Sequence, residues 1–251
     1  MDAESIEDLN ERAGPCLRAL QELIAQGTAD HVPPHEGRRP FYVGWGFLAS
    51  LERQARAVVS LHQAGLGHEA APNRRLMIEL MAHLEWLAQD GEDAVDSMNK
   101  AFQYKHGGLR KAADADGFEY DSGTAASADE VQAAEIPGNP TNQFNVTSKL
   151  LGRLGAKLPT VWLTETQYSH ATLTGARAFF DDSDANSVRL FNEPHFGSVD
   201  AAADASLFVA FMLLFIGMEA FDTLMVGTPW KDVMAPIGIQ GGLSKPDNSP
   251  S

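Results

Sequence analysis

Hydrophobic residues recur at steps of three and four along most of this chain, the spacing that places them on one face of an α-helix. In the first such segment, Ile6, Leu9 and Ala13 begin a stripe that continues to Leu23. The pattern predicts about seven helices, over residues 6–23, 40–64, 72–89, 90–102, 144–155, 160–176 and 198–226. Residues 187–196 alternate only weakly between apolar and polar, which allows at most a short extended segment or hairpin.

Glycine and proline mark several predicted helix ends. Gly27 should end the first helix, and Gly227 with Pro229 should end the last. Pro15 lies inside the first predicted helix and should kink or divide it, because proline lacks the amide hydrogen that the helix uses. The second helix is expected to open after Pro40.

Two segments are apolar enough to form the centre of the fold. Residues 205–218 carry no charge, but this run of 14 residues is shorter than the roughly 20 needed to cross a bilayer, so it predicts a core helix. Residues 72–89 carry a row of leucines widened by methionine and tryptophan. That row is Leu76, Leu80, Leu84 and Leu87, with Met77, Met81 and Trp86 beside it. In the next helix, which Asp90 should cap, the predicted buried row is Val95, Met98 and Phe102.

We therefore predict an all-α protein with a single multi-helix domain over residues 1–237. An acidic loop insertion at 112–148 interrupts it, with seven acidic residues, no Lys or Arg, and room for one short helix near 128–135. Residues 238–251 have the composition of a disordered C-terminal tail.

Composition narrows the classes of function. The chain has 251 residues and a formal net charge of -15, which repels nucleic acid and anionic membrane surfaces. Its single cysteine, Cys16, cannot form an internal disulfide. The first residues are acidic where an export signal would be basic and then apolar, so we expect a cytoplasmic protein. The sequence holds none of the short motifs for nucleotide, zinc-protease, hydrolase-elbow or calcium sites, and we expect no cofactor.

The segment QYSHATLTGAR carries the most distinctive polar pattern. On one continuous helix, Thr166, His170, Thr174 and Arg177 would form a single row, with Tyr168 at its edge. Hydroxyl and imidazole groups at a helix contact commonly act as hydrogen-bonded glue. The alternative is a ligand-binding or catalytic pocket, in which His170 would be an acid, a base or a ligand contact because imidazole titrates near neutral pH.

Two further groups of residues fit known chemistry less specifically. Glu79 and His83 lie four residues apart on one helix face, and with His62 they would be metal ligands, although a hydrogen-bonded pair explains the same spacing. Arg56 and His62 have the arginine-to-histidine spacing of HEPN-type ribonucleases, and so does the pair Arg189 and His195. With twelve arginines and eight histidines in the chain, such spacings also arise by chance.

Several short motifs resemble one family. The stretches RRLMIEL at 74–80, LEWLA at 84–88, GEDA at 91–94 and YSHA at 168–171 are similar to a family of bacterial all-helical proteins known as a domain of unknown function. The resemblance covers residues 40–225. It implies a helical fold without an established activity and a distant likeness to HEPN-type domains.

These observations lead to two hypotheses about function, and they leave open whether the protein is an enzyme. The first is a non-enzymatic protein that binds partners or a small ligand. The alternative is a HEPN-like ribonuclease or toxin, acting as a homodimer through Arg56 and His62. The sequence does not identify the partner, and the net charge argues against nucleic acid.

Overall fold

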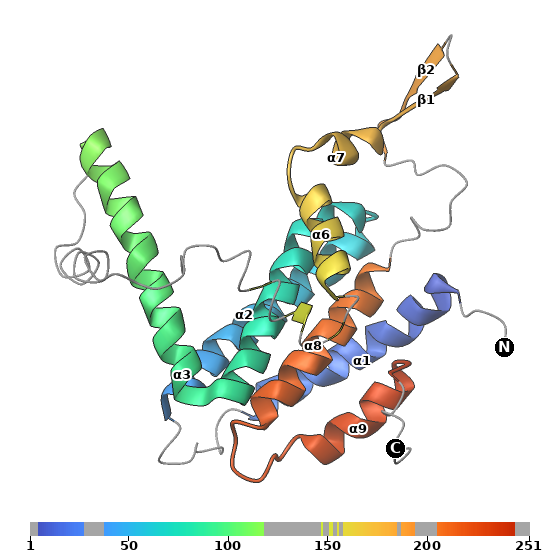
Figure 1. Cartoon of the computed structure of the whole chain (residues 1–251). Coiled ribbons are helices and arrows are strands. Elements are labelled where there is room, and N and C mark those ends of the chain that lie inside the picture. The colour runs from blue at the N-terminus through green and yellow to red at the C-terminus, as the bar shows by residue number, and fades with distance from the viewer. Residues whose placement is uncertain are drawn as a thin grey trace.

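The computed structural model of the chain describes residues 5–27, 38–117, 147, 151–152, 155, 158–184, 187–193 and 205–243. Its elements are mainly helices, as predicted, with one short hairpin (Figure 1). The helices are α1 (Ile6–Gly27), α2 (Arg38–Gln63), α3 (Ala71–Asp116), α6 (Leu158–Ser169), α7 (Leu173–Arg177), α8 (Ser206–Asp222) and α9 (Lys231–Gln240), and a short 3-10 turn, η2 (His68–Ala70), precedes α3. None of the described helices is long and apolar enough to span a membrane.

Helix α8 lies at the centre of the fold, which confirms the prediction from its uncharged sequence. It contacts α1, α2 and α3 (Figure 1), and most of its side chains are buried, with a half-buried to exposed side that includes Glu219. At Gly217, α8 packs closely against α2 and α3: a β-carbon there would collide with the Leu51 side chain and lie 3.1 Å from Cδ1 of Leu84. Burial of the apolar side chains between α8 and the helices around it is the main source of the protein's stability.

Proline limits the first two helices less than the sequence suggested. Helix α1 continues without division through Pro15 and ends at Gly27 as predicted. Helix α2 begins at Arg38 instead of after Pro40. Pro40 therefore lies in the first turn, where a missing amide hydrogen costs nothing because that group has no partner in the helix.

Helix α3 breaks at Gly91, next to the boundary that the sequence predicted. Gly91 has φ 54° and ψ -122°, a conformation that favours glycine. Beyond it the outer half of α3 extends away from the other helices (Figure 1) and reaches Asp116, so the first residues of the predicted insertion are helical. Residues 118–146, including the predicted short helix at 128–135, lie outside the described part of the chain.

Each of the two predicted apolar rows on α3 ends in, or begins with, a residue that is exposed. Leu80, Leu84 and Leu87 are in the core, whereas Leu76 is 38% exposed. Val95 is buried and Met98 is half-buried, but Phe102 is 51% exposed because the outer half of α3 has left the core by that point.

The predicted single helix over residues 160–176 is wrong. Helix α6 ends at Ser169, the chain bends, and Thr172 caps α7 by accepting a hydrogen bond from the amide of Gly175 at 3.2 Å. Strands β1 (Phe180–Asp184) and β2 (Ser187–Leu190) follow as an antiparallel hairpin. We call α7, β1 and β2 the arm, because they project from the helical body (Figure 1).

The C-terminal part of the chain is more ordered than predicted. Helix α8 ends at Asp222, and Gly227 lies with φ 76° in the turn that leads to α9. The carboxylate of Asp222 fixes this turn by accepting a hydrogen bond from the amide of Trp230 at 2.9 Å. Helix α9 includes Gly238, which packs against Phe215. The predicted start of the tail at residue 238 therefore lies before the end of this helix.

Candidate functional site

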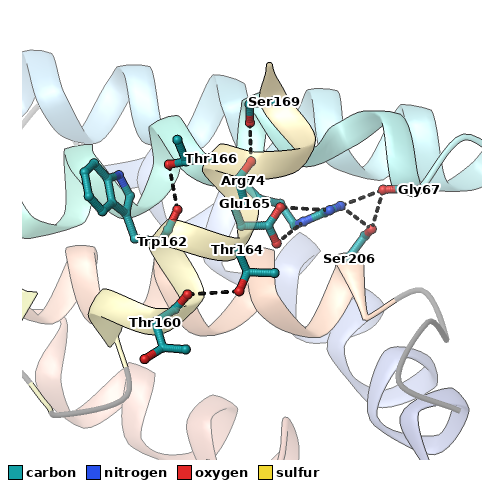
Figure 2. A network of polar contacts seen from close by, with 9 residues as sticks. All are labelled: Gly67, Arg74, Thr160, Trp162, Thr164, Glu165, Thr166, Ser169 and Ser206. Atoms are coloured by element: carbon teal, nitrogen blue, oxygen red, sulfur yellow. Dashed lines mark hydrogen bonds and ion pairs between the residues drawn. The ribbon is translucent and has the colours of Figure 1, made fainter. Parts of the chain in front are cut away.

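A buried ion pair joins α6 to α3. The guanidinium of Arg74 donates from Nε to Oε1 of Glu165 at 2.8 Å and from Nη2 to Oε2 at 3.0 Å (Figure 2). Arg74 and Glu165 are 8% and 9% exposed. Two parallel hydrogen bonds between charged groups are strong and fix the orientation of both side chains.

The remaining donors of Arg74 bind two other segments. Its Nη1 donates to the carbonyl oxygen of Gly67 at 2.6 Å and to the hydroxyl of Ser206 at 2.8 Å. The Ser206 hydroxyl in turn donates to the same Gly67 carbonyl at 3.0 Å (Figure 2). We call Arg74, Glu165, Ser206 and Gly67 the Arg74 network. Its polar groups satisfy one another at the meeting point of α3, α6, α8 and the turn before η2, which is what a structural anchor requires.

A second polar group lies one residue along α3. The guanidinium of Arg75 binds Oε1 of Glu79 at 2.9 Å and donates from Nε to the hydroxyl of Thr166 at 3.1 Å. The indole nitrogen of Trp162 donates to the same Glu79 oxygen at 3.1 Å, and Arg75 lies over the indole ring. Thr166 donates its own hydroxyl hydrogen to the carbonyl of Trp162 at 2.8 Å. These contacts hold the side of α6 that carries Trp162 and Thr166 against α3.

The predicted polar row does not form, because the helix that should carry it ends at Ser169. Thr166 is half-buried and engaged as described, but His170 lies exposed in the bend after α6. Arg177 is exposed in α7, and the side chain of Thr174 is outside the described part. Tyr168 is half-buried, and its ring packs edge-on against His68 with the centroids 4.9 Å apart.

We expect His170→Ala to leave the stability almost unchanged, because an exposed imidazole at a bend contributes little. The loss should be below about 0.5 kcal/mol, which is a shift of the thermal midpoint of less than about 2 °C. Thr166→Val, which removes a half-buried hydroxyl with two hydrogen bonds, should cost about 1 kcal/mol or more. Thermal unfolding followed by circular dichroism compares the two variants, and a larger loss for His170→Ala would contradict this placement.

The three candidate metal ligands do not converge on one point. The carboxylate of Glu79 binds Arg75 and Trp162, while Nδ1 of His83 lies 2.6 Å from the backbone oxygen of Glu79. The His83 ring packs between Phe47 and Trp86, and His62 lies near the end of α2. Within the residues that the structure describes, no three His, Cys, Asp or Glu side chains form a group that could hold a metal ion.

The two candidate ribonuclease pairs also occupy unconnected positions. Arg56 is exposed on α2 and forms an ion pair with Glu52. Six residues along a helix correspond to a rotation that leaves Arg56 and His62 about 120° apart around α2. Arg189 lies in β2 opposite Asp181, and His195 is outside the described residues.

Sequence reasoning missed the ion pair at the centre of this site. Arg74 belongs to the motif RRLMIEL and Glu165 precedes the segment that drew attention, but nothing linked them. The available signal was the position of each charge: Arg74 lies at the start of a strongly apolar helix, and Glu165 follows Trp162 by one helical turn. Comparison with protein families, curated proteins and solved structures found no match to this chain.

A pair of carboxylates lies where α3 passes the C-terminal part of α8. Burial raises the pKa of Glu85, and burial together with the charges of Glu85 and Asp222 raises the pKa of Glu219. A carboxyl group whose pKa is raised by folding favours the folded state while it is protonated. That contribution is complete below the ordinary carboxyl pKa and is lost as the pH rises through the raised value.

Glu219→Gln should therefore stabilise the protein at pH 7 and have little effect at pH 4. Because Glu219 is only partly buried and solvent screens its charge, we expect a gain of only about 0.5 kcal/mol at pH 7. Urea unfolding at several pH values measures this gain. Glu69→Gln makes the same change in net charge on the exposed turn η2, so it separates the local effect from general repulsion. An equal gain at pH 4 and pH 7 would contradict the assignment.

Proposed function

We propose that this protein is a non-enzymatic interaction protein that binds its partner through the arm. The observation that carries the proposal is the concentration of exposed apolar side chains in the short arm. The helical body also exposes apolar side chains, such as Phe102 and Val226, but these are spread over several elements. In the arm, large apolar side chains are exposed: Leu190 by 81%, Leu173 by 67% and Val188 by 60%.

Physical chemistry supports a binding role for such a surface. A two-stranded hairpin is at best marginally stable in water, and an amphipathic sheet is stabilised when its apolar face is covered. Clustered exposed apolar side chains on soluble proteins mark interaction sites. By contrast, the candidate catalytic residues belong to separate places: Arg56 and His62 to α2, Tyr168 to α6 and His170 to the bend after it.

The test compares the full chain with two matched variants. Val188→Asp/Leu190→Asp places charges on the arm, and Val226→Asp places one at a side chain that is 65% exposed in the loop after α8. Each purified protein is immobilised and exposed to an extract of its source cells, and the retained proteins are quantified. We expect the arm variant alone to lose specific partners.

Equal retention by all three proteins would contradict the role of the arm. RNA cleavage by the full chain that disappears in Arg56→Ala would contradict the non-enzymatic proposal and favour the ribonuclease alternative. Circular dichroism of each variant verifies that the helical body is intact.

A further inference from the structure

Helix α9 covers two aromatic side chains of the core helix α8. It lies at the outside of the helical body and packs on α1 and α8 (Figure 1). Its glycines allow a close contact: a β-carbon on Gly241 would collide with the ring of Phe211, and one on Gly238 would lie 2.8 Å from Cζ of Phe215. Both rings are buried. We call the surface around Phe211 and Phe215 the α9 site.

The turn that leads into α9 contains a strained residue. Thr228 has φ 44°, and within the described part of the chain it is the only residue other than glycine with a positive φ. A β-branched side chain is poorly tolerated in this left-handed region, and the following Pro229 favours an extended conformation at Thr228. The side chain of Thr228 is exposed, so its own packing does not compensate for the strain.

Hydrogen bonds around the turn hold this conformation in place. The carboxylate of Asp222 accepts from the amide of Trp230 at 2.9 Å, and the carbonyl of Thr228 accepts from the amide of Lys231 at 3.3 Å. Strained backbone of this kind persists only where its surroundings impose it, and it is typical of segments that change conformation. Opening of the turn would release the strain but would uncover apolar surface on α9 and α8.

We infer that α9 exchanges between two copies of this chain, with the turn at Gly227 and Thr228 as the hinge. In the exchanged dimer each α9 binds the α9 site of the other copy, so every contact of the helix is kept and only the turn differs. A short hinge under strain favours such an exchange. The inference goes beyond the proposed function, because it does not involve the arm.

The charges at this contact do not oppose the exchange. Residues 205–218 of α8 carry no charge, and α9 carries one positive and one negative side chain, Lys231 and Asp232. The α9 site is covered in the monomer and in the exchanged dimer alike. The net charge of -15 on each chain opposes the approach of the two bodies, so the dimer should become more stable as salt screens this repulsion.

Sedimentation equilibrium of the full chain tests the inference. Because exchange requires α9 to detach, each sample is incubated until its mass distribution is constant. We expect the wild-type mass to rise with concentration from 27.1 kDa towards twice that value. Thr228→Gly relieves the strain of the closed turn and should raise the dissociation constant at least about tenfold. Val226→Gly is the matched control: it loosens the same loop at an exposed residue without relieving a positive φ, and should change the dissociation constant far less.

Two further variants distinguish exchange of α9 from any other mode of dimerisation. Gly241→Ala adds a methyl group that would collide with Phe211, and Phe211→Leu removes the ring atoms of that collision, so each change weakens the contact within its own chain. In a mixed exchanged dimer, the enlarged helix binds the enlarged site and the unchanged helix binds the unchanged site. A one-to-one mixture should therefore form heterodimers, detected by native mass spectrometry, at concentrations where each variant alone is monomeric.

A wild-type chain that stays monomeric at all concentrations would overturn the inference, and so would a dimer that Thr228→Gly leaves unchanged. Heterodimers no more abundant than the homodimers of the single variants would place the dimer contact elsewhere and contradict it as well. Circular dichroism verifies that each variant keeps its helices, and Thr228→Gly decides the question by itself if Phe211→Leu fails to fold. Failure of this inference leaves the proposed function of the arm intact, because the arm variants are tested on their own.

Discussion

Glu165→Ala is expected to lower the free energy of unfolding by about 3–5 kcal/mol, the largest effect among the substitutions considered. Removing one member of a buried ion pair leaves the other charge without compensation in a medium that solvates it poorly. In this protein the uncompensated charge is Arg74, which is 8% exposed and, among the described residues, would keep only Gly67 and Ser206 as partners. Urea unfolding measured by fluorescence gives the change in free energy.

Two further proteins give this experiment its controls. Arg74→Met/Glu165→Leu removes both charges and should recover most of the lost stability, because an apolar pair does not carry the desolvation penalty. Asp96→Ala breaks the ion pair between Asp96 and Arg39. Both side chains are more than half exposed, so the free energy of unfolding should change little. A loss below about 1 kcal/mol in Glu165→Ala would contradict the anchoring role of the Arg74 network.

Gly217→Ala is expected to destabilise the protein by about 1–3 kcal/mol, although alanine is the better helix former. The added methyl group would collide with Leu51 and crowd Leu84, and both of these side chains are fully buried. Close-packed cores have no space to absorb an extra carbon, so side chains or helices must move. Thermal or urea unfolding measures the loss.

Gly46→Ala is the matched control for that substitution. Gly46 also lies within a helix, but a β-carbon there would have no neighbour within 4 Å. With no steric cost, the lower backbone entropy of alanine in the unfolded chain should stabilise the protein by about 0.5–1 kcal/mol. A similar change in both variants would contradict the close approach of α8 to α2 and α3.

Sequence pattern predicted the elements whose environment is uniform along their length. Helix α8 could be identified as the core because no charge interrupts residues 205–218, and the structure buries most of its side chains. The boundary near Asp90 was visible because an aspartate followed by further acidic residues is typical of a helix N-cap. The break itself falls at Gly91, because glycine adopts its conformation more easily than other residues.

The pattern failed where tertiary geometry changes within a run of regular spacing. The polar row through His170 has helical spacing, but spacing cannot show that the chain bends after Ser169 and that Thr172 starts a new helix. Phe102 continues the spacing of Val95, yet α3 has left the core by then. Periodicity states which residues share a face and not whether another element covers that face.

The Arg74 network could not be predicted from the sequence for a different reason. Its partners come from elements that are not adjacent in sequence, and no local pattern relates Arg74 to Glu165 or to Ser206. The same holds for the contact of the Glu79 carboxylate with Trp162, whereas His83 contacts the backbone oxygen of Glu79 four residues away. Pairs of polar residues that are distant in sequence can be identified only once the fold is known.

The sequence separations within the Arg74 network also determine when it forms during folding. Glu165 lies 91 positions from Arg74, and Ser206 lies 132 positions away. Closing such long loops is entropically costly, so we expect these contacts to form after the transition state. Loss of Glu165 should then accelerate unfolding while leaving the rate of refolding nearly unchanged. The network thus sets the lifetime of the folded molecule and has little influence on how fast the chain folds.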